Sequence, residues 1–186
     1  MLQLHNIRPD LNIKPIRGNI DTRISKLVNG EFEGIIIAAA GLKRLGWKQA
    51  NNEIFFNNLL KNNANLGVEY LEADNFIPAV GQGALAIEIR DNDSEVFNII
   101  KILNNHDDAI CVETERAFLK EIDGGCEIPI GAYATLKDEE ITLSGFIGDE
   151  KKLAIFSDII TDNIKYHKNI GINLAKRLKT LKNNNI

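Results

Sequence analysis

The sequence contains few residues that would support a disulfide framework or a zinc site. Its 186 residues include two cysteines, four prolines and one tryptophan. The two cysteines, Cys111 and Cys126, are far apart and match no zinc-binding spacing. We therefore expect no metal site and a protein that stays reduced in the cytoplasm.

Long apolar runs are also missing. No stretch reaches the roughly 20 residues that a membrane-spanning helix needs, and the chain does not open with the charged and apolar regions of a secretory signal. The net charge of −4 argues against general nucleic-acid binding. The composition is 44% hydrophobic and 26% charged, which is typical of a globular protein of one or two domains without membrane or nucleic-acid partners.

The N-terminal region has the pattern of a βαβ unit. Residues 11–16 alternate as in a strand, and residues 34–38 form the continuous apolar run of a buried parallel strand. Between them, residues 20–28 place apolar side chains on one helical face, and Asn19 is the expected N-cap. Strand, helix and strand at this spacing predict a right-handed crossover.

Three arginines fall near the ends of these elements. Arg17 and Arg44 follow the two predicted strands, and Arg23 lies in the first turns of the helix. Ligands of open α/β sheets bind beyond the carboxyl ends of the strands, and arginine binds carboxylates in a two-bonded fork. A ligand with several carboxylates is therefore one expectation. Three solvated surface arginines are the alternative.

The middle of the chain predicts mixed structure. Residues 45–75 read as one or two helices with an Asn-rich connection, and residues 78–83 as a tight loop. A strand is expected over residues 84–90 and an amphipathic helix over residues 93–104. Gln82, between two glycines of the loop, either offers amide contacts to a ligand or only turns the chain.

The last third predicts a small α+β domain. A helix over residues 109–122 carries Cys111, which we interpret as a core residue. Two strands joined by a turn, a third strand and a final helix follow. The expected ranges are strands over 130–136, 141–147 and 153–159, and a helix over 171–182.

Gly124, Gly125 and Cys126 stand between this helix and the first of these strands. Paired glycines remove side-chain bulk and allow backbone angles closed to other residues. One interpretation is a helix end followed by a packed cysteine. The other is an accessible thiol beside backbone that a large ligand can approach.

Three blocks of the chain together resemble porphobilinogen deaminase, also called hydroxymethylbilane synthase. Their order and spacing fit this family, and the resemblance covers nearly the whole chain. The blocks are Arg17-Gly-Asn-Ile-Asp-Thr-Arg23 running on to Ala38-Ala-Ala-Gly-Leu-Lys-Arg-Leu45, then Pro78-Ala-Val-Gly-Gln-Gly-Ala-Leu-Ala-Ile-Glu88, and then Glu115-Arg-Ala-Phe118 with Gly124-Gly-Cys-Glu-Ile-Pro-Ile-Gly-Ala-Tyr133.

The resemblance implies a fold of the α/β plus α+β class. It implies a partial βαβ domain like those of periplasmic binding proteins, followed by a small α+β domain with a three-stranded antiparallel sheet. The expected divisions are residues 1–77 for part of the second domain, 78–105 for a segment that returns to the first domain, and 106–186 for the domain that attaches the cofactor.

The resemblance also implies a transferase of haem and tetrapyrrole biosynthesis. Such an enzyme joins four porphobilinogens head to tail, releases ammonia at each step, and is primed by a dipyrromethane cofactor on a cysteine thioether. Cys126 matches the attachment cysteine. The residues that match binding positions for cofactor, substrate and oligopyrrole intermediates are Arg17, Arg23 and Arg44, and those lining the same cleft are Ala38 and Gln82.

The resemblance places the family's catalytic aspartate in a first domain that would precede Met1, so no catalytic residue is assigned within this chain. We expect porphobilinogen chemistry only together with an N-terminal half, which a separate polypeptide could supply. The resemblance implies that the full-length family enzyme is monomeric. Two alternatives stay open at this point: a non-catalytic module that binds polycarboxylate pyrroles, and an inactive remnant.

Overall fold

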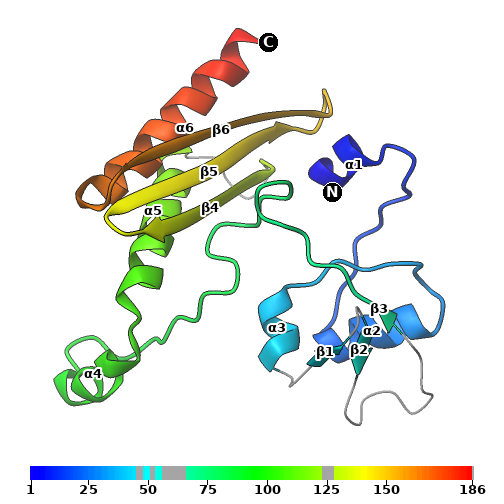
Figure 1. Cartoon of the computed structure of the whole chain (residues 1–186), viewed down its shortest axis with the longest axis horizontal. Coiled ribbons are helices and arrows are strands. Elements are labelled where there is room, and N and C mark those ends of the chain that lie inside the picture. The colour runs from blue at the N-terminus through cyan, green and yellow to red at the C-terminus, as the bar shows by residue number, and fades with distance from the viewer. Residues whose placement is uncertain (45–47, 51–52, 56–65, 123–127, 186) are drawn as a thin grey trace. The chain divides into compact units, whose positions relative to one another are not determined.

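The computed structural model divides the chain into two compact units. The larger unit consists of Met1–Leu11 and Glu72–Ile186, and the smaller unit of Asn12–Leu71. Figure 1 labels the helices and strands of both units. The structure describes residues 1–44, 48–50, 53–55, 66–122 and 128–185.

A three-stranded antiparallel sheet forms the centre of the larger unit. Strands β4 (Ile130–Lys137), β5 (Glu140–Asp149) and β6 (Ala154–Asn163) follow one another along the chain and pair in that order. A short turn joins β4 to β5, with Asp138 at a positive φ of 55°. The predicted hairpin and third strand are confirmed, since β4 pairs antiparallel with β5 and β5 with β6.

Two long helices cover one face of this sheet (Figure 1). They are α5 (His106–Ile122) and α6 (His167–Asn184), the latter entered through a 3-10 turn, η2 (Ile164–Tyr166). Both helices extend beyond the predicted ranges. The fully buried side chains between helices and sheet include Phe118, Ile141, Leu143, Ile170, Leu174 and Leu178.

The N-terminus belongs to the larger unit. Helix α1 (Leu2–Ile7) buries Leu2, which lies against Gly148 of β5. The side-chain amide of Gln3 donates to the carbonyl of Ile77 at 2.8 Å and accepts from its N–H at 2.9 Å. These paired bonds attach the first helix to a segment that is distant along the chain.

The smaller unit contains α2 (Ile20–Val28), α3 (Ala39–Arg44) and short strands β1 (Lys48–Ala50), β2 (Glu53–Phe55) and β3 (Leu66–Gly67). The three strands pair antiparallel in chain order. Helix α2 is confirmed together with its cap, because Asn19 Oδ1 accepts from the N–H of Thr22 at 2.8 Å. The core of the smaller unit is formed by Ile24 and Leu42. The apolar side chains packed around them are Ile20, Val28, Ile35, Ile37, Leu66 and Val68.

The predicted βαβ unit is only partly present. Residues 11–16 and 34–38 are not strands in the structure, although the helix between them forms. The expected helices over residues 45–75 are also wrong where that range is described, since β1, β2 and β3 lie there. A strand is defined by its hydrogen-bonded pairing with a neighbouring strand. An apolar run such as 34–38 predicts burial, but it does not predict which strand lies beside it.

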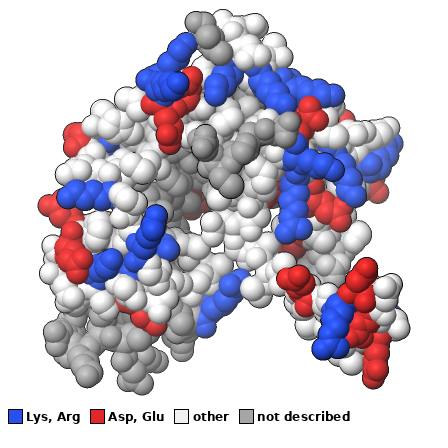
Figure 2. Space-filling model, turned by 180° about the vertical axis from the view of Figure 1, so that it is seen from behind, with Lys and Arg blue, Asp and Glu red and all other residues white. Residues whose placement is uncertain are grey.

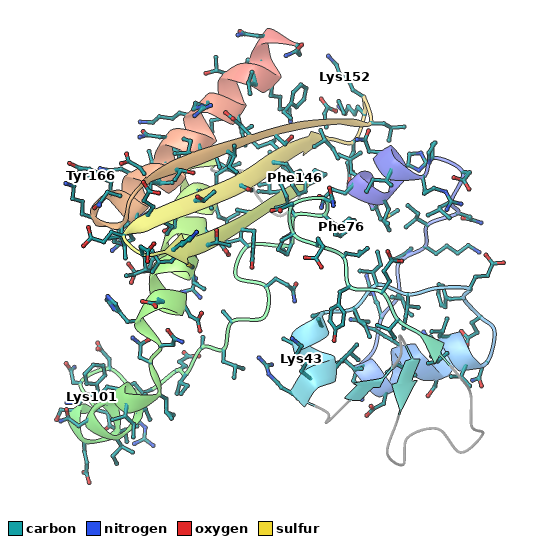
Figure 3. All side chains as sticks on the ribbon, in the orientation of Figure 1. Lys43, Phe76, Lys101, Phe146, Lys152 and Tyr166 are labelled. Atoms are coloured by element: carbon teal, nitrogen blue, oxygen red, sulfur yellow. The ribbon has the colours of Figure 1, made fainter. Side chains whose placement is uncertain are left out.

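Residues 84–103 contain less regular structure than the sequence predicted. Residues 84–90 form no strand, and the expected helix appears as α4 (Ser94–Ile100) with a 3-10 turn, η1 (Lys101–Leu103). Neither α4 nor η1 buries a residue, and Figure 3 shows side chains projecting outward around the labelled Lys101. The large apolar side chains exposed here are Leu85, Ile87, Val96, Phe97, Ile99, Ile102 and Leu103.

Charges of both signs are interspersed on the face of the molecule seen in Figure 2. Among the residues that the structure describes, no helix is long and apolar enough to cross a bilayer.

Candidate functional site

The predicted site residues are divided between the two units. Arg17, Arg23, Ala38 and Arg44 belong to the smaller unit, and Gln82 to the larger one. Cys126, with Gly124 and Gly125, lies outside the residues that the structure describes. Helix α5 ends at Ile122.

Arg17 and Arg23 flank the N-terminal end of α2. The Nε–H of Arg23 donates to the carbonyl of Gly18, the residue after Arg17, at 2.8 Å. Gly18 has a φ of +121°, which strains any residue other than glycine. The structure therefore holds the Arg23 side chain against the turn that begins α2, next to Arg17 in the sequence, and forms no parallel strands of the kind that the sequence predicted beside these arginines.

Ala38 and Arg44 occupy the two ends of α3. The half-buried Ala38 precedes the helix, and its carbonyl accepts from the N–H of Gly41 at 3.0 Å. Arg44 is the exposed last residue of the helix. The Nζ of its neighbour Lys43 lies 5.8 Å from the centre of the Tyr70 ring, a distance at which a cation and an aromatic ring attract each other.

Gln82 lies on a tight loop of the larger unit. Its backbone N–H donates to the carbonyl of Ala79 at 2.9 Å, and the N–H of Ala84 donates to the carbonyl of Gly81 at 3.1 Å. Gly81 and Gly83 have φ values of 70° and 87°, which glycine adopts without strain. The predicted loop is confirmed, and Gln82 is exposed on it.

Glu115 of α5 is the buried carboxylate beside this loop. The residue is only 6% exposed to solvent. Oε2 accepts from the N–H of Gly81 at 2.6 Å, and Oε1 accepts from the N–H of Ala134 on β4 at 2.9 Å. Burial raises the pKa of the Glu115 carboxyl, and the two N–H bonds offset part of that increase.

The sequence predicted no role for Glu115, which is only the first residue of a block that resembles the family. The spacing of Glu115, Phe118 and Ile122 nevertheless indicates one face of a helix, and Phe118 and Ile122 are buried in the core. A carboxylate on such a stripe needs partners, but the sequence does not indicate which backbone groups supply them.

The outer edge of β4 is closed by these contacts instead of by another strand. The N–H of Ala132 donates to the carbonyl of Pro78 at 3.1 Å, and that of Ala134 to Glu115. These two alternate N–H groups therefore have acceptors outside the sheet, one from the loop and one from helix α5.

Cys111 is half-buried and packs against the core of the larger unit, which confirms its interpretation as a core residue. Burial is the main cause that raises the pKa of its thiol, and the negative charges of Glu115, Asp108 and Asp107 add to it. A raised pKa leaves little thiolate near neutral pH, so this cysteine is a poor nucleophile.

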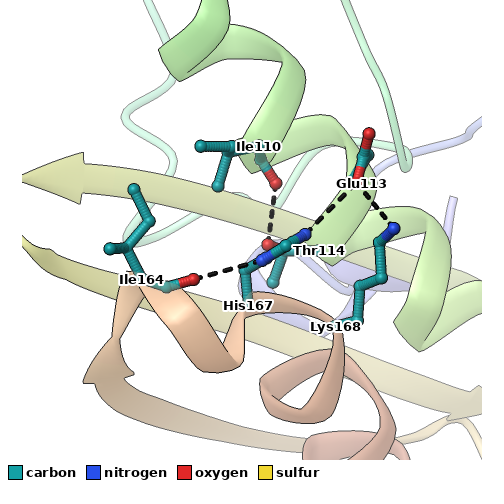
Figure 4. Close-up of polar contacts among 6 residues, drawn as sticks. All are labelled: Ile110, Glu113, Thr114, Ile164, His167 and Lys168. Atoms are coloured by element: carbon teal, nitrogen blue, oxygen red, sulfur yellow. Dashed lines mark hydrogen bonds and ion pairs between the residues drawn. The ribbon is translucent and has the colours of Figure 1, made fainter.

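A polar cluster joins α5 to α6 on the surface (Figure 4). Glu113 accepts from His167 Nε2 at 3.2 Å and from Lys168 Nζ at 3.0 Å, and His167 Nδ1 lies 3.1 Å from the carbonyl of Ile164. Among the described residues, no group of three or more His, Cys, Asp or Glu side chains could hold a metal ion.

These features define a two-unit α+β protein that has arginines around one capped helix and a glycine-rich loop fixed to its C-terminal sheet. Two family models match it: residues 1–98 match "Porphobilinogen deaminase, dipyromethane cofactor binding domain", and residues 109–180 match "Porphobilinogen deaminase, C-terminal domain". The chain belongs to the porphobilinogen deaminase family.

Curated relatives named porphobilinogen deaminase agree with these matches. The protein from Staphylococcus epidermidis is 42% identical over 174 residues, which are 92% of this chain and 50% of that protein. The protein from Halalkalibacterium halodurans is 47% identical over 154 residues, 82% of this chain and 45% of the relative. The protein from Vesicomyosocius okutanii is 39% identical over 178 residues, which are 96% of this chain and 53% of that protein. The chain thus spans about half the length of the curated relatives it matches.

Proposed function

We propose that this chain holds the dipyrromethane cofactor of a hydroxymethylbilane synthase. The reaction is the head-to-tail joining of four porphobilinogens, in which each step forms one carbon–carbon bond and releases the aminomethyl nitrogen as ammonia. The match of residues 1–98 to the dipyrromethane-binding domain carries this proposal. The porphobilinogen deaminase relatives support the same assignment.

The arginines suit the carboxylates of such ligands. Porphobilinogen carries one acetate and one propionate side chain, and an oligopyrrole carries a pair on every ring. The Nε–H bond of Arg23 to Gly18 holds its guanidinium at the start of α2, and the remaining donors can bind a carboxylate in a fork. The helix N-terminus adds partial positive charge there. Arg17, Arg23 and Arg44 are the proposed anion-binding groups, and Ala38 and Gln82 are the other residues proposed to bind the cofactor.

Cys126 is the proposed attachment residue. A thiolate is the soft nucleophile that forms a stable thioether, and the alternative cysteine is half-buried with a raised thiol pKa. When bound, the dipyrromethane supplies a terminal pyrrole onto which further units are added. A cytoplasmic location is part of the proposal, because a reducing compartment keeps the Cys126 thiol free.

The proton chemistry is proposed to come from the other half of a family-length enzyme. The resemblance assigns the catalytic aspartate to that half.

That half, as a partner of this chain, would also complete the fold of the smaller unit. Ile35 and Ile37 pack on the Ile24 cluster while Ile36 is exposed, the alternation of a strand covered on one face. We therefore propose that residues 11–16 and 34–38 become parallel strands of a domain like those of periplasmic binding proteins. The domain limits 1–77, 78–105 and 106–186 are part of this proposal.

An intact-mass spectrum tests the proposal. The purified chain is measured before and after incubation with porphobilinogen, alone and mixed with the N-terminal half of the Staphylococcus epidermidis relative. A dipyrromethane adduct that maps to Cys126 is the expected result, with oligopyrrole product formed only in the mixture. An unmodified chain in both samples would refute cofactor binding, and turnover by the chain alone would refute the need for the other half.

A further inference from the structure

Strand β6 lies at the side of the C-terminal sheet opposite to β4 (Figure 1). Among the residues that the structure describes, its only strand neighbour is β5. The strand is ten residues long, Ala154–Asn163. An edge of this length presents a row of backbone N–H and C=O groups with which another strand can pair. The contacts of these groups therefore decide whether the edge is open or closed.

Alternate residues of β6 direct their N–H groups away from the sheet. On β4, the N–H groups of Ala132 and Ala134 point outward, to acceptors that are not strands. In an antiparallel ladder the direction of the hydrogen bonds alternates from one residue to the next. Following the registers from β4 to β5 and from β5 to β6, the even-numbered residues of β6 bond to β5. The odd-numbered residues, from 155 to 163, direct their N–H groups outward.

Two aspartates of β6 occupy outward N–H groups. Oδ1 of Asp158 accepts from the N–H of Ile159 at 2.8 Å, and Oδ1 of Asp162 accepts from that of Asn163 at 2.7 Å. Each carboxylate oxygen takes the bond that the carbonyl of an added strand would need. Ile159 is near the middle of β6, whereas Asn163 is its last residue. The Asp158 bond therefore interrupts the row of donors at its centre.

Helix α6 holds the Asp158 carboxylate in this position. Nη2 of Arg177 lies 2.7 Å from Asp158 Oδ2, so that one oxygen binds the helix and the other binds the strand edge. The side chain of Asp158 is only 19% exposed. A carboxylate that is bound from two directions has little freedom to turn away from the Ile159 N–H.

We propose that the outer edge of β6 is a pairing surface for a second copy of this chain and that Asp158 keeps it closed. A second copy fits because β6 can pair with itself antiparallel about a two-fold axis at Ile159. Position 157 then lies opposite position 161 of the other copy, and the two three-stranded sheets become one. The Ile159 side chain, which is 55% exposed, would pack against its symmetry mate.

The same symmetry explains why Asp158 opposes this pairing. About an axis at Ile159, the two Asp158 side chains are diagonal neighbours, roughly 7–8 Å apart at their Cα atoms. Their like charges repel each other, and each carboxylate already occupies the central N–H of its own strand. The closure involves only the sheet and α6 of the larger unit, so it is independent of cofactor binding.

Four variants separate this closure from a general effect of charge. Asp158→Ala removes the bond to the Ile159 N–H and the ion pair with Arg177. Arg177→Gln removes the ion pair but leaves the carboxylate on the strand edge. Asp149→Ala is the matched control, because it removes an equal charge whose Oδ1 binds N–H groups of the turn after β5. Ser157→Pro, added to Asp158→Ala, replaces an outward N–H without removing a bond to β5.

Sedimentation velocity of the full chain at several protein concentrations is the test. We expect Asp158→Ala to lower the dissociation constant of the dimer about tenfold or more relative to the parent, the effect of freeing one hydrogen-bond donor and removing one charge. Arg177→Gln should change it less, and Asp149→Ala not at all. The Asp158→Ala/Ser157→Pro variant should return to the parent value. If Asp158→Ala does not fold, Asp158→Thr, which favours strands, takes its place.

Amide hydrogen exchange locates the contact. In Asp158→Ala, exchange at Ser157 and Thr161 should slow as the protein concentration rises, because these N–H groups become paired between copies. An association that Ser157→Pro does not reverse would place the dimer on another surface and overturn the proposal. The proposal would also be wrong if Asp149→Ala associated as strongly as Asp158→Ala, if Asp158→Ala associated no more than the parent, or if the parent already protected Ser157 and Thr161 in this way.

Discussion

Gly171 on helix α6 lies directly against the backbone carbonyl of Thr114 on helix α5. A Cβ at position 171 would also lie 2.7 Å from the backbone nitrogen of Phe118. Neither atom is the movable end of a side chain, so the two helices would have to separate. We expect Gly171→Ala to lower the free energy of unfolding by about 1–3 kcal/mol, despite the better helix propensity of alanine, as measured by urea denaturation.

Asn173→Ala is the control for this prediction. Asn173 lies two residues further along α6 and is exposed. Alanine there should leave the stability unchanged or raise it slightly. A Gly171→Ala variant as stable as Asn173→Ala would contradict the close crossing of α5 and α6.

The ion pairs of Glu113 predict a dependence of stability on pH. Hydrogen bonds from Lys168 and His167 lower the pKa of the Glu113 carboxyl below its usual value of 4.5. A lowered pKa in the folded state means that the stabilisation is present above the unfolded-state pKa and is lost as the pH falls through the folded-state value. The side chain is 49% exposed, so the gain at pH 7 should not exceed about 0.5–1 kcal/mol.

The measurement compares the unfolding free energies of the parent and Glu113→Gln between pH 7 and pH 3. The difference between them should shrink as the pH falls. The matched control is Glu150→Gln on the exposed turn after β5, which should follow the parent across the range. A difference that grows at low pH would contradict the assigned partners.

The two cysteines should behave differently towards porphobilinogen. Cys126→Ser should abolish any covalent dipyrromethane, because the thioether is proposed to form there. Cys111→Ser should retain the adduct, since the Cys111 thiol has a pKa raised by burial and by nearby carboxylates. Intact mass with peptide mapping distinguishes them, and equal loss in both variants would remove Cys126 from its proposed role.

The arginines at α2 should contribute to binding in a way that other arginines do not. Arg17→Gln and Arg23→Gln should each weaken the binding of porphobilinogen about tenfold, the loss of one charged hydrogen bond or fork. Arg8→Gln is the control. The guanidinium of Arg8 is already engaged by Asp10, with bonds of 2.8 Å and 2.6 Å that hold the pKa of the Asp10 carboxyl at about 2.

Calorimetric titration with porphobilinogen measures these dissociation constants. Equal weakening in all three variants would indicate a nonspecific effect of charge. No weakening in Arg17→Gln and Arg23→Gln would exclude these residues from the binding site.

The C-terminal sheet and its helices could be predicted from sequence because their signals are local. Ile170, Leu174 and Leu178 recur at helical spacing and are buried, and the alternating residues of β4 and β5 meet across a short turn. Leu181, three residues after Leu178, is 40% exposed, although its neighbour Lys182 donates to the carbonyl of Gly148 on β5.

The smaller unit was harder to predict because its pairing is not local. The Asn19 cap and Ile24 were read correctly from short-range pattern. The strands at residues 11–16 and 34–38 were not formed, because an apolar run specifies burial without specifying a neighbour. The arginines of the candidate site remain predictions from residue type and resemblance, whereas Glu115 was missed because its partners are backbone groups distant in sequence.

The closed edge of β4 also bears on how the protein behaves at high concentration. Two alternate N–H groups, those of Ala132 and Ala134, already have acceptors from Pro78 and Glu115. An extended segment from another molecule therefore finds no row of free donors to pair with on that side. Glu115 therefore opposes edge-to-edge aggregation of the sheet. We expect that replacing Glu115 lowers the solubility of the folded protein.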